Sequence, residues 1–144
     1  MQAIQFFHLR SNRSFRNRTK VKKFLGKLAQ REKAKIQELR IIFCSDKYLL
    51  DINRSFLKHD YYTDIITFQL SLPSEPIVGE IYISLDRVAD NARTYSTSFT
   101  RELHRVIFHG LLHLCGYKDK LKSDQQEMRD LEERYLNLYF SSKQ

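Results

Sequence analysis

The sequence predicts an α+β fold, a single domain in which a mixed four-stranded sheet packs with helices around one buried central helix. Four short segments rich in β-branched and aromatic residues have the composition of strands, and they are interspersed with five segments of helical periodicity. One helical segment, residues 99–115, is apolar enough to be largely buried. The 144 residues suffice for one hydrophobic core, and we find no repeat, linker or second domain, so we expect residues 1–144 to form one unit.

The strands are expected where apolar residues run together between turn signals. The second carries Leu39, Ile41, Ile42 and Phe43, a mostly buried run. Both prolines of the chain fall in a turn before the fourth strand. The four expected strands are residues 3–9, 38–44, 63–68 and 77–84.

The helices are expected from apolar residues at helical spacing and from polar residues that can cap their first turns. Ser45 is a candidate N-cap for the second helix, and Ser84 or Asp86 for the third. Residues 123–126 have the pattern of a capping box and are expected to begin the last helix. The other expected helices are residues 19–34, 46–57, the stretch ending near 95, and 99–115.

A basic segment follows the first expected strand. Residues 10–35 contain eleven Lys or Arg and one acidic residue, Glu32, in a chain of net charge +8. A solvated helix face is the ordinary explanation of such a run, but this density of positive charge favours a polyanionic partner such as RNA. The candidate phosphate contacts in this segment are Arg13, Arg16, Arg18, Lys20, Lys22 and Lys23.

The sequence also contains a possible metal site. His109 and His113 are four residues apart, a spacing that turns a helix by about 400° and points both imidazoles the same way. Gly116 can end the helix, so that Asp119 returns to the same ion. Three ligands with an open position are typical of a catalytic zinc site. The alternative is a pair of hydrogen-bonded core histidines. Gly110 stands where a metalloprotease motif needs Glu, so peptide hydrolysis is not indicated.

The stretch His109–Tyr117, His-Gly-Leu-Leu-His-Leu-Cys-Gly-Tyr, resembles the signature H-G-x-L-H-L-x-G-Y-D-H of the YbeY family. That resemblance implies a small bacterial metal-dependent endoribonuclease that matures ribosomal RNA and acts in ribosome quality control. The family has Asp-His where this chain has Lys118-Asp119. The third ligand position therefore holds a carboxylate, which is a competent zinc ligand but makes the site harder.

Two more stretches resemble the family. Asn53 and Phe56 fit the pattern L-N-x-x-Y-R, and the segment from Thr63 to Phe68 fits T-D-V-L-S-F. Leu57 stands where the family has its functional arginine. Lys58 or Arg54 could replace it in contacting phosphate, and Lys58 is included among the candidate RNA contacts. A third stretch, residues 79–84, resembles G-D-I-x-I-S.

Two charged residues of the central helix are candidate catalytic groups. Glu102 is seven residues before His109 and returns to its face of the helix, where it could orient a ligand or accept a proton. Arg105 is four residues before His109 and could contact phosphate. The alternative for Glu102 is an exposed carboxylate in the first turn of the helix. The alternatives for Arg105 are a solvated side chain or an ion pair with Glu102.

We therefore expect a metal-dependent endoribonuclease with one divalent ion per chain, zinc by preference, that acts on RNA and at the ribosome. The alternative is a metal-containing RNA- or ribosome-binding factor with little activity. Two cysteines without a C-x-x-C pattern are typical of a reducing cytoplasm. We expect no membrane partner, because no apolar run is long enough to span a bilayer.

Overall fold

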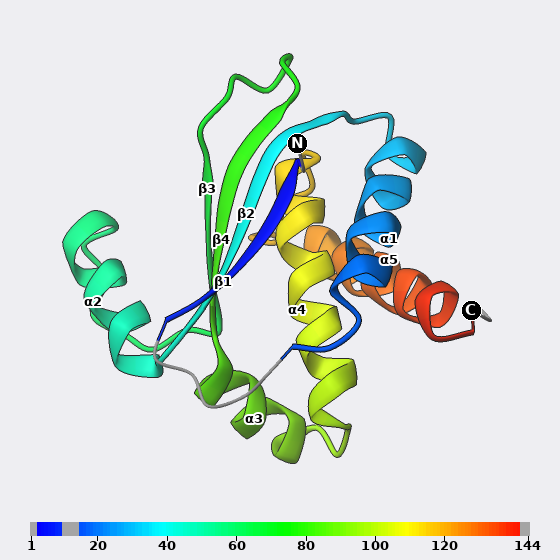
Figure 1. Ribbon diagram of the computed structural model, residues 1–144. Helices are drawn as coiled ribbons and strands as arrows, with labels where there is room; N and C mark the ends of the chain where they lie inside the picture. The colour runs from blue at the N-terminus through cyan, green and yellow to red at the C-terminus, as the bar shows by residue number, and fades with distance from the viewer. Residues whose placement is uncertain (1–2, 10–14, 142–144) are drawn as a thin grey trace.

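The computed structural model describes residues 3–9 and 15–141 and contains a four-stranded sheet surrounded by helices (Figure 1). In chain order the elements are β1 (Ile4–His8), α1 (Arg18–Arg31), β2 (Ile36–Cys44), α2 (Asp46–Phe56), β3 (Ile65–Gln69), β4 (Ile77–Ser84), α3 (Leu85–Thr94), α4 (Phe99–Leu114) and α5 (Lys122–Ser141).

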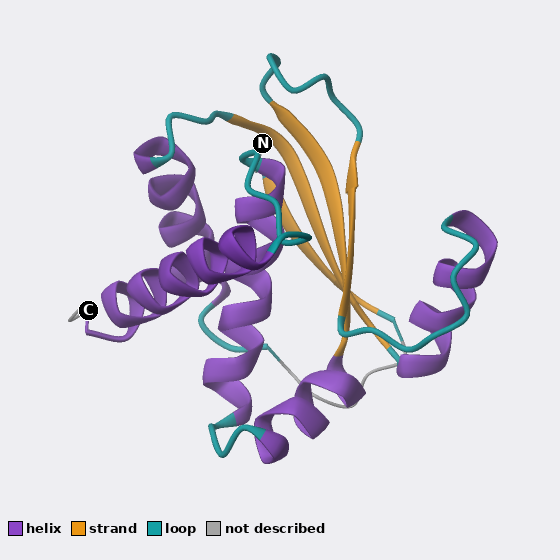
Figure 2. Ribbon diagram, turned by 180° about the vertical axis from the view of Figure 1, so that it is seen from behind, coloured by secondary structure: helices purple, strands orange, loops and turns teal. Residues whose placement is uncertain are grey.

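The strand order in the sheet is β1-β2-β4-β3. β1 pairs with β2 and β2 with β4 in parallel, whereas β3 runs antiparallel to β4 along one edge. The sheet is therefore mixed, as the sequence predicts. Helices α1, α4 and α5 cover one face, α2 lies on the other, and α3 sits at one end (Figures 1 and 2).

The core lies between the sheet and α4, which is the buried central helix that the sequence predicts. Ile107 and Leu111 of α4 are fully buried, as is Ile81 of β4. Gly110 allows the close approach, because a Cβ atom added there would lie 2.8 Å from Cδ1 of Ile81. A helix that lies this close to the sheet brings His109 and His113, on either side of Gly110, near the antiparallel edge formed by β3.

Serine side chains cap three of the helices. Ser45 accepts the backbone N–H of Tyr48 at the start of α2, and Ser84 accepts that of Arg87 at the start of α3. Ser98 caps α4 in the same way. The caps at residues 45 and 84 confirm the predictions from sequence.

The predicted capping box of the last helix is wrong. The backbone N–H of Gln125 donates to the carbonyl of Leu121, so α5 begins at Lys122 and Ser123 lies inside its first turn. Within residues 3–9 and 15–141, no helix has the length and apolar character needed to cross a membrane.

Candidate metal centre

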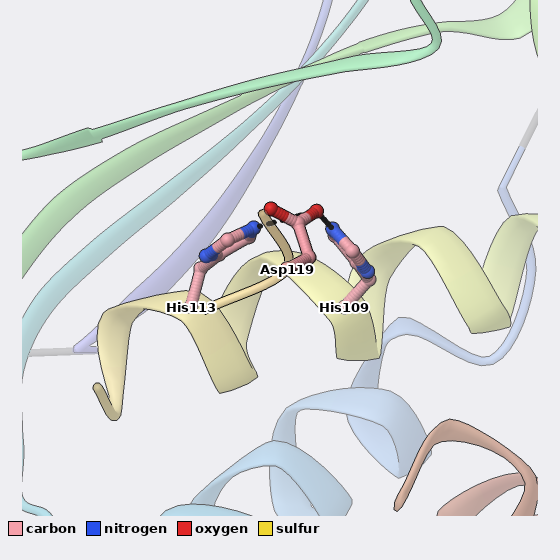
Figure 3. Close-up of side chains that lie close together, drawn as sticks. All are labelled: His109, His113 and Asp119. Carbon is pink, nitrogen blue, oxygen red and sulfur yellow. Dashed lines mark ion pairs between the residues drawn. The ribbon is translucent and has the colours of Figure 1, made fainter. Parts of the chain in front are cut away.

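Three side chains converge at the C-terminal end of α4 (Figure 3). His109 and His113 project from one face of the helix, and the loop after it supplies Asp119. α4 ends at Leu114, and Gly116 takes a φ of +111°, a value that glycine adopts readily. The glycine stop and the returning carboxylate are thus arranged as the sequence predicts.

The donor atoms are spaced as they would be around one ion. Oδ2 of Asp119 lies 3.4 Å from Nε2 of His109 and 3.3 Å from Nε2 of His113. Two ligands of a tetrahedral zinc ion, at about 2.0–2.1 Å each from the metal, are roughly 3.3–3.4 Å apart. One ligand atom from each of the three residues lies within 4.8 Å of the others, and all three residues are half-buried. The donor set of two imidazoles and one carboxylate therefore fits a divalent metal with an open coordination position.

Glu132 of α5 holds His109 from the other side. Its carboxylate contacts Nδ1 of His109, and the residue is only 4 % exposed. A donated Nδ1–H leaves Nε2 of the ring as the free acceptor that faces Asp119. The sequence reasoning missed Glu132, which lies on another element. The available signal was a glutamate among the apolar positions of the last helix, near Met128 and Tyr135.

Arg105 sits at the centre of a group of carboxylates. Its guanidinium donates to Glu102 at 2.6 and 2.9 Å and to Glu132 at 3.0 Å, and it lies 3.7 Å from Asp64. Burial alone lowers the pKa of Arg105, but the hydrogen bonds and charges of Glu102 and Glu132 raise it above its usual value. Its charge is therefore largely balanced by protein carboxylates.

Glu102 is 3 % exposed, so the alternative of an exposed surface carboxylate is wrong. Glu102 and His109 line the same hollow, and Arg105 links Glu102 to the carboxylate that contacts His109. In this arrangement Glu102 can position the site through Arg105.

The three donor side chains line a cavity of about 720 Å³ that opens beside β3 and the loop before it. Asp64, from the family-like Thr63-Asp64 pair, also lines it, and burial raises the pKa of this carboxyl although Arg105 and His109 oppose the shift. Leu57 lines the same cavity, at the position where the family has arginine. Lys58 follows Leu57 with a left-handed backbone (φ 55°).

The loop that carries Asp119 is tied to α1 by Glu32, the single acidic residue of the basic segment. Its carboxylate accepts the hydroxyl of Tyr117 at 2.6 Å and that of Tyr135 of α5. The hydrogen bond to Glu32, and then burial, raise the pKa of Tyr117 to about 12, whereas burial, and then the hydrogen bond to Glu32, raise that of Tyr135 to about 12, so both hydroxyls stay protonated donors. Glu32 thus helps to fix the loop between His113 and Asp119.

The described part of the basic segment lies apart from the metal site. Arg18, Lys20 and Lys23 line a separate hollow at the start of α1, and Arg16 lies two residues before Arg18 without lining it. Lys20 also lies over the ring of Tyr139, and Lys22 near that of Phe6. Arg13 lies outside the described residues. Among the residues that the structure describes, none of this basic group lines the cavity at the metal site.

Comparison with known proteins gives consistent matches. The family model "Endoribonuclease YbeY" matches residues 7–139. An "Endoribonuclease YbeY" of Cytophaga hutchinsonii is 49 % identical over 137 residues, which are 95 % of this chain and 96 % of that protein. One from Porphyromonas gingivalis is 47 % identical over 116 residues, 81 % of this chain and 76 % of that protein. The solution structure of TM1509 from Thermotoga maritima superposes with a TM-score of 0.63 at 26 % identity, and the match covers 96 % of this chain and 89 % of that one.

The fold and the site, taken with these matches, define a nuclease, that is, a hydrolase acting on RNA. In particular, the chain belongs to the endoribonuclease YbeY family. The resemblance seen in the sequence motif is thereby confirmed over nearly the whole chain.

Proposed function

We propose that the protein is a metal-dependent endoribonuclease that cleaves single-stranded RNA at the site formed by His109, His113 and Asp119, with one zinc ion per chain as its cofactor. The observation that carries this proposal is the convergence of both Nε2 atoms on one carboxylate oxygen, 3.3 and 3.4 Å away, inside a cavity. We propose that residues 1–144 form one metal-dependent hydrolase domain.

A divalent ion at this site would polarise a phosphoryl oxygen and make a water molecule more acidic. The residues around it prepare the site. Glu132 holds the ring of His109 with Nε2 toward the cavity, and Arg105 keeps Glu132 in place. Asp64 lines the cavity and has a raised pKa, so its carboxylate is a better proton acceptor near neutral pH than an exposed aspartate. We assign it the proton that an attacking water gives up.

The substrate in the cell is proposed to be ribosomal RNA, and the place of action the ribosome in the cytoplasm. The net charge of +8 and the basic residues at the start of α1 support an RNA partner. Arg16, Arg18, Lys20, Lys22 and Lys23, with Arg13 and Lys58, are the proposed phosphate contacts. Cys44 and Cys115 are free thiols, which supports a reducing compartment.

One observation favours a second function, that of an RNA- or ribosome-binding factor with little activity. Leu57 places an apolar side chain in the cavity at the position of the family's arginine. A phosphate bound there would lack one preplaced positive partner in the transition state.

Cleavage assays separate the two functions, because RNA binding is common to both. The purified protein should cleave single-stranded RNA, lose this activity with a chelator, and regain it with added zinc. His109→Ala, purified identically, should be inactive. If His109→Ala cleaves as fast as the parent, the activity comes from elsewhere, and the binding-factor function replaces the enzyme.

A further inference from the structure

The loop between α2 and β3 presents two aromatic rings that are stacked on each other. The rings of His59 and Tyr61 are 5.2 Å apart at an interplanar angle of 20°, and the hydroxyl of Tyr61 lies 2.9 Å from Nδ1 of His59. Both residues are exposed, Tyr61 by 55 %. Because both rings are exposed, their stacking contributes little to the hydrophobic core. The stacked pair instead leaves an aromatic surface open to a ligand.

The backbone of the loop is hydrogen-bonded to Asn53, a buried residue of α2. The carbonyl of Asn53 accepts the backbone N–H of His59 at 3.0 Å, and its side-chain amide donates to the carbonyl of Tyr61 at 2.9 Å. One buried residue therefore fixes the backbone under both rings. A binding surface that is already ordered loses little conformational entropy when a ligand arrives.

The ring pair lies at the metal site. His59 and Tyr61 line the same cavity of about 720 Å³ as His109, His113 and Asp119. The charge of that cavity is not strongly positive, because Lys120 and Arg105 face two aspartates, and Arg105 is already paired with Glu102 and Glu132. Apart from a bound metal ion, the protein groups of this cavity therefore offer little attraction for phosphate.

We propose that His59 and Tyr61 form a stacking platform for one unpaired nucleobase of the RNA, and so bring an adjoining phosphodiester to the metal site. The proposal rests on the proposed function, since it names how the RNA is held at that site. Aromatic side chains bind unpaired bases by stacking whatever the base, because every base has a π-face. A base within a duplex has both faces covered by its neighbours, so the platform selects single-stranded RNA.

Binding and cleavage are tested separately. The chain contains no tryptophan, so Tyr61→Trp introduces a single tryptophan, which can be excited selectively over the tyrosines and can still stack. Binding of a short oligoadenylate, and of a chain of the same length with abasic sugars, is measured by anisotropy on the protein as purified. The length of the oligonucleotide is determined after each binding measurement, so that cleavage is measured in the same samples.

Tyr61→Ala should weaken oligoadenylate binding about tenfold, the effect of losing one base–aromatic stack, and should leave abasic binding unchanged. Tyr61→Trp should keep the affinity, and its fluorescence should be quenched by oligoadenylate but not by the abasic chain. Tyr62→Ala is the matched control: Tyr62 is 53 % exposed in the same loop, but its ring lies beneath Arg87 and does not line the cavity. It should bind like the parent.

The platform is overturned if Tyr61→Ala binds oligoadenylate like the parent, if it loses abasic binding equally, or if the Y61W fluorescence is not quenched. Absence of cleavage by the parent would contradict the proposed function instead, and the binding data would still decide whether the bases stack on Tyr61.

Discussion

Replacing Glu132 by Gln removes a buried charge that contacts both a proposed metal ligand and an arginine. One carboxylate oxygen accepts Nη1 of Arg105 at 3.0 Å, and the other contacts Nδ1 of His109. The amide has nearly the same size, but one of its two oxygen positions becomes an N–H₂ donor, so it cannot accept both hydrogen bonds. Losing such an outer partner of a ligating histidine typically weakens metal binding by about 10–100-fold, or roughly 1.4–2.7 kcal/mol.

Zinc titration against a competing chelator measures this loss directly, and thermal unfolding of the metal-free proteins shows whether the variant still folds. Glu133→Gln is the matched control, because Glu133 is the next residue, has a side chain 61 % exposed, and pairs with Arg101 at 2.7 Å. It should bind zinc like the parent. An unchanged zinc affinity in Glu132→Gln would refute the role of Glu132, and an equal loss in Glu133→Gln would show that overall charge, and not the contact to His109, sets the affinity.

Three further predictions concern packing, catalysis and RNA binding. Gly110→Ala should lower the free energy of unfolding by about 1 kcal/mol, since the new Cβ lies 2.8 Å from a buried side chain of β4 and this overpacking outweighs the gain in helix propensity. Gly26→Ala has nothing within 4 Å of the new Cβ, so it should raise the free energy of unfolding by about 1 kcal/mol. Urea denaturation measures both, and a stabilised Gly110→Ala would contradict the close approach of α4. Leu57→Arg should raise the rate of RNA cleavage by about tenfold at unchanged zinc content, because it places a positive charge in the cavity. An unchanged rate would show that Leu57 does not limit cleavage. Replacing Arg18 and Lys23 by Gln should reduce the slope of log affinity against log salt by about 0.7 per lost contact with single-stranded RNA, and an unchanged slope would show that this hollow does not bind phosphate.

Much of the fold follows from local sequence signals. The fourth strand was predicted to the residue, because Ile77 and Ser84 bound a run of β-forming residues between a proline turn and a serine cap. The convergence of His109, His113 and Asp119 was also predictable, since the spacing of the two histidines and the stop at Gly116 are local properties of one helix and its end.

What the sequence could not show depends on contacts between distant elements. Glu132 reaches His109 only because α5 packs against α4, and nothing in the spacing of 23 residues indicates this. Glu32 looked like an isolated acid in a basic run, yet it accepts hydrogen bonds from two tyrosines that are far along the chain. The predicted start of α5 is wrong because residues 123–126 match the capping-box pattern although the helix already begins at Lys122.

The metal content of the purified protein tests the central claim most directly. Elemental analysis should find about one divalent metal ion per chain in the parent, zinc by preference, and almost none in His113→Ala, because loss of one of three ligands leaves only Nε2 of His109 and the Asp119 carboxylate. Asp119→His should retain the metal, since imidazole is a common zinc ligand. Full occupancy in His113→Ala, measured on folded protein, would contradict the site.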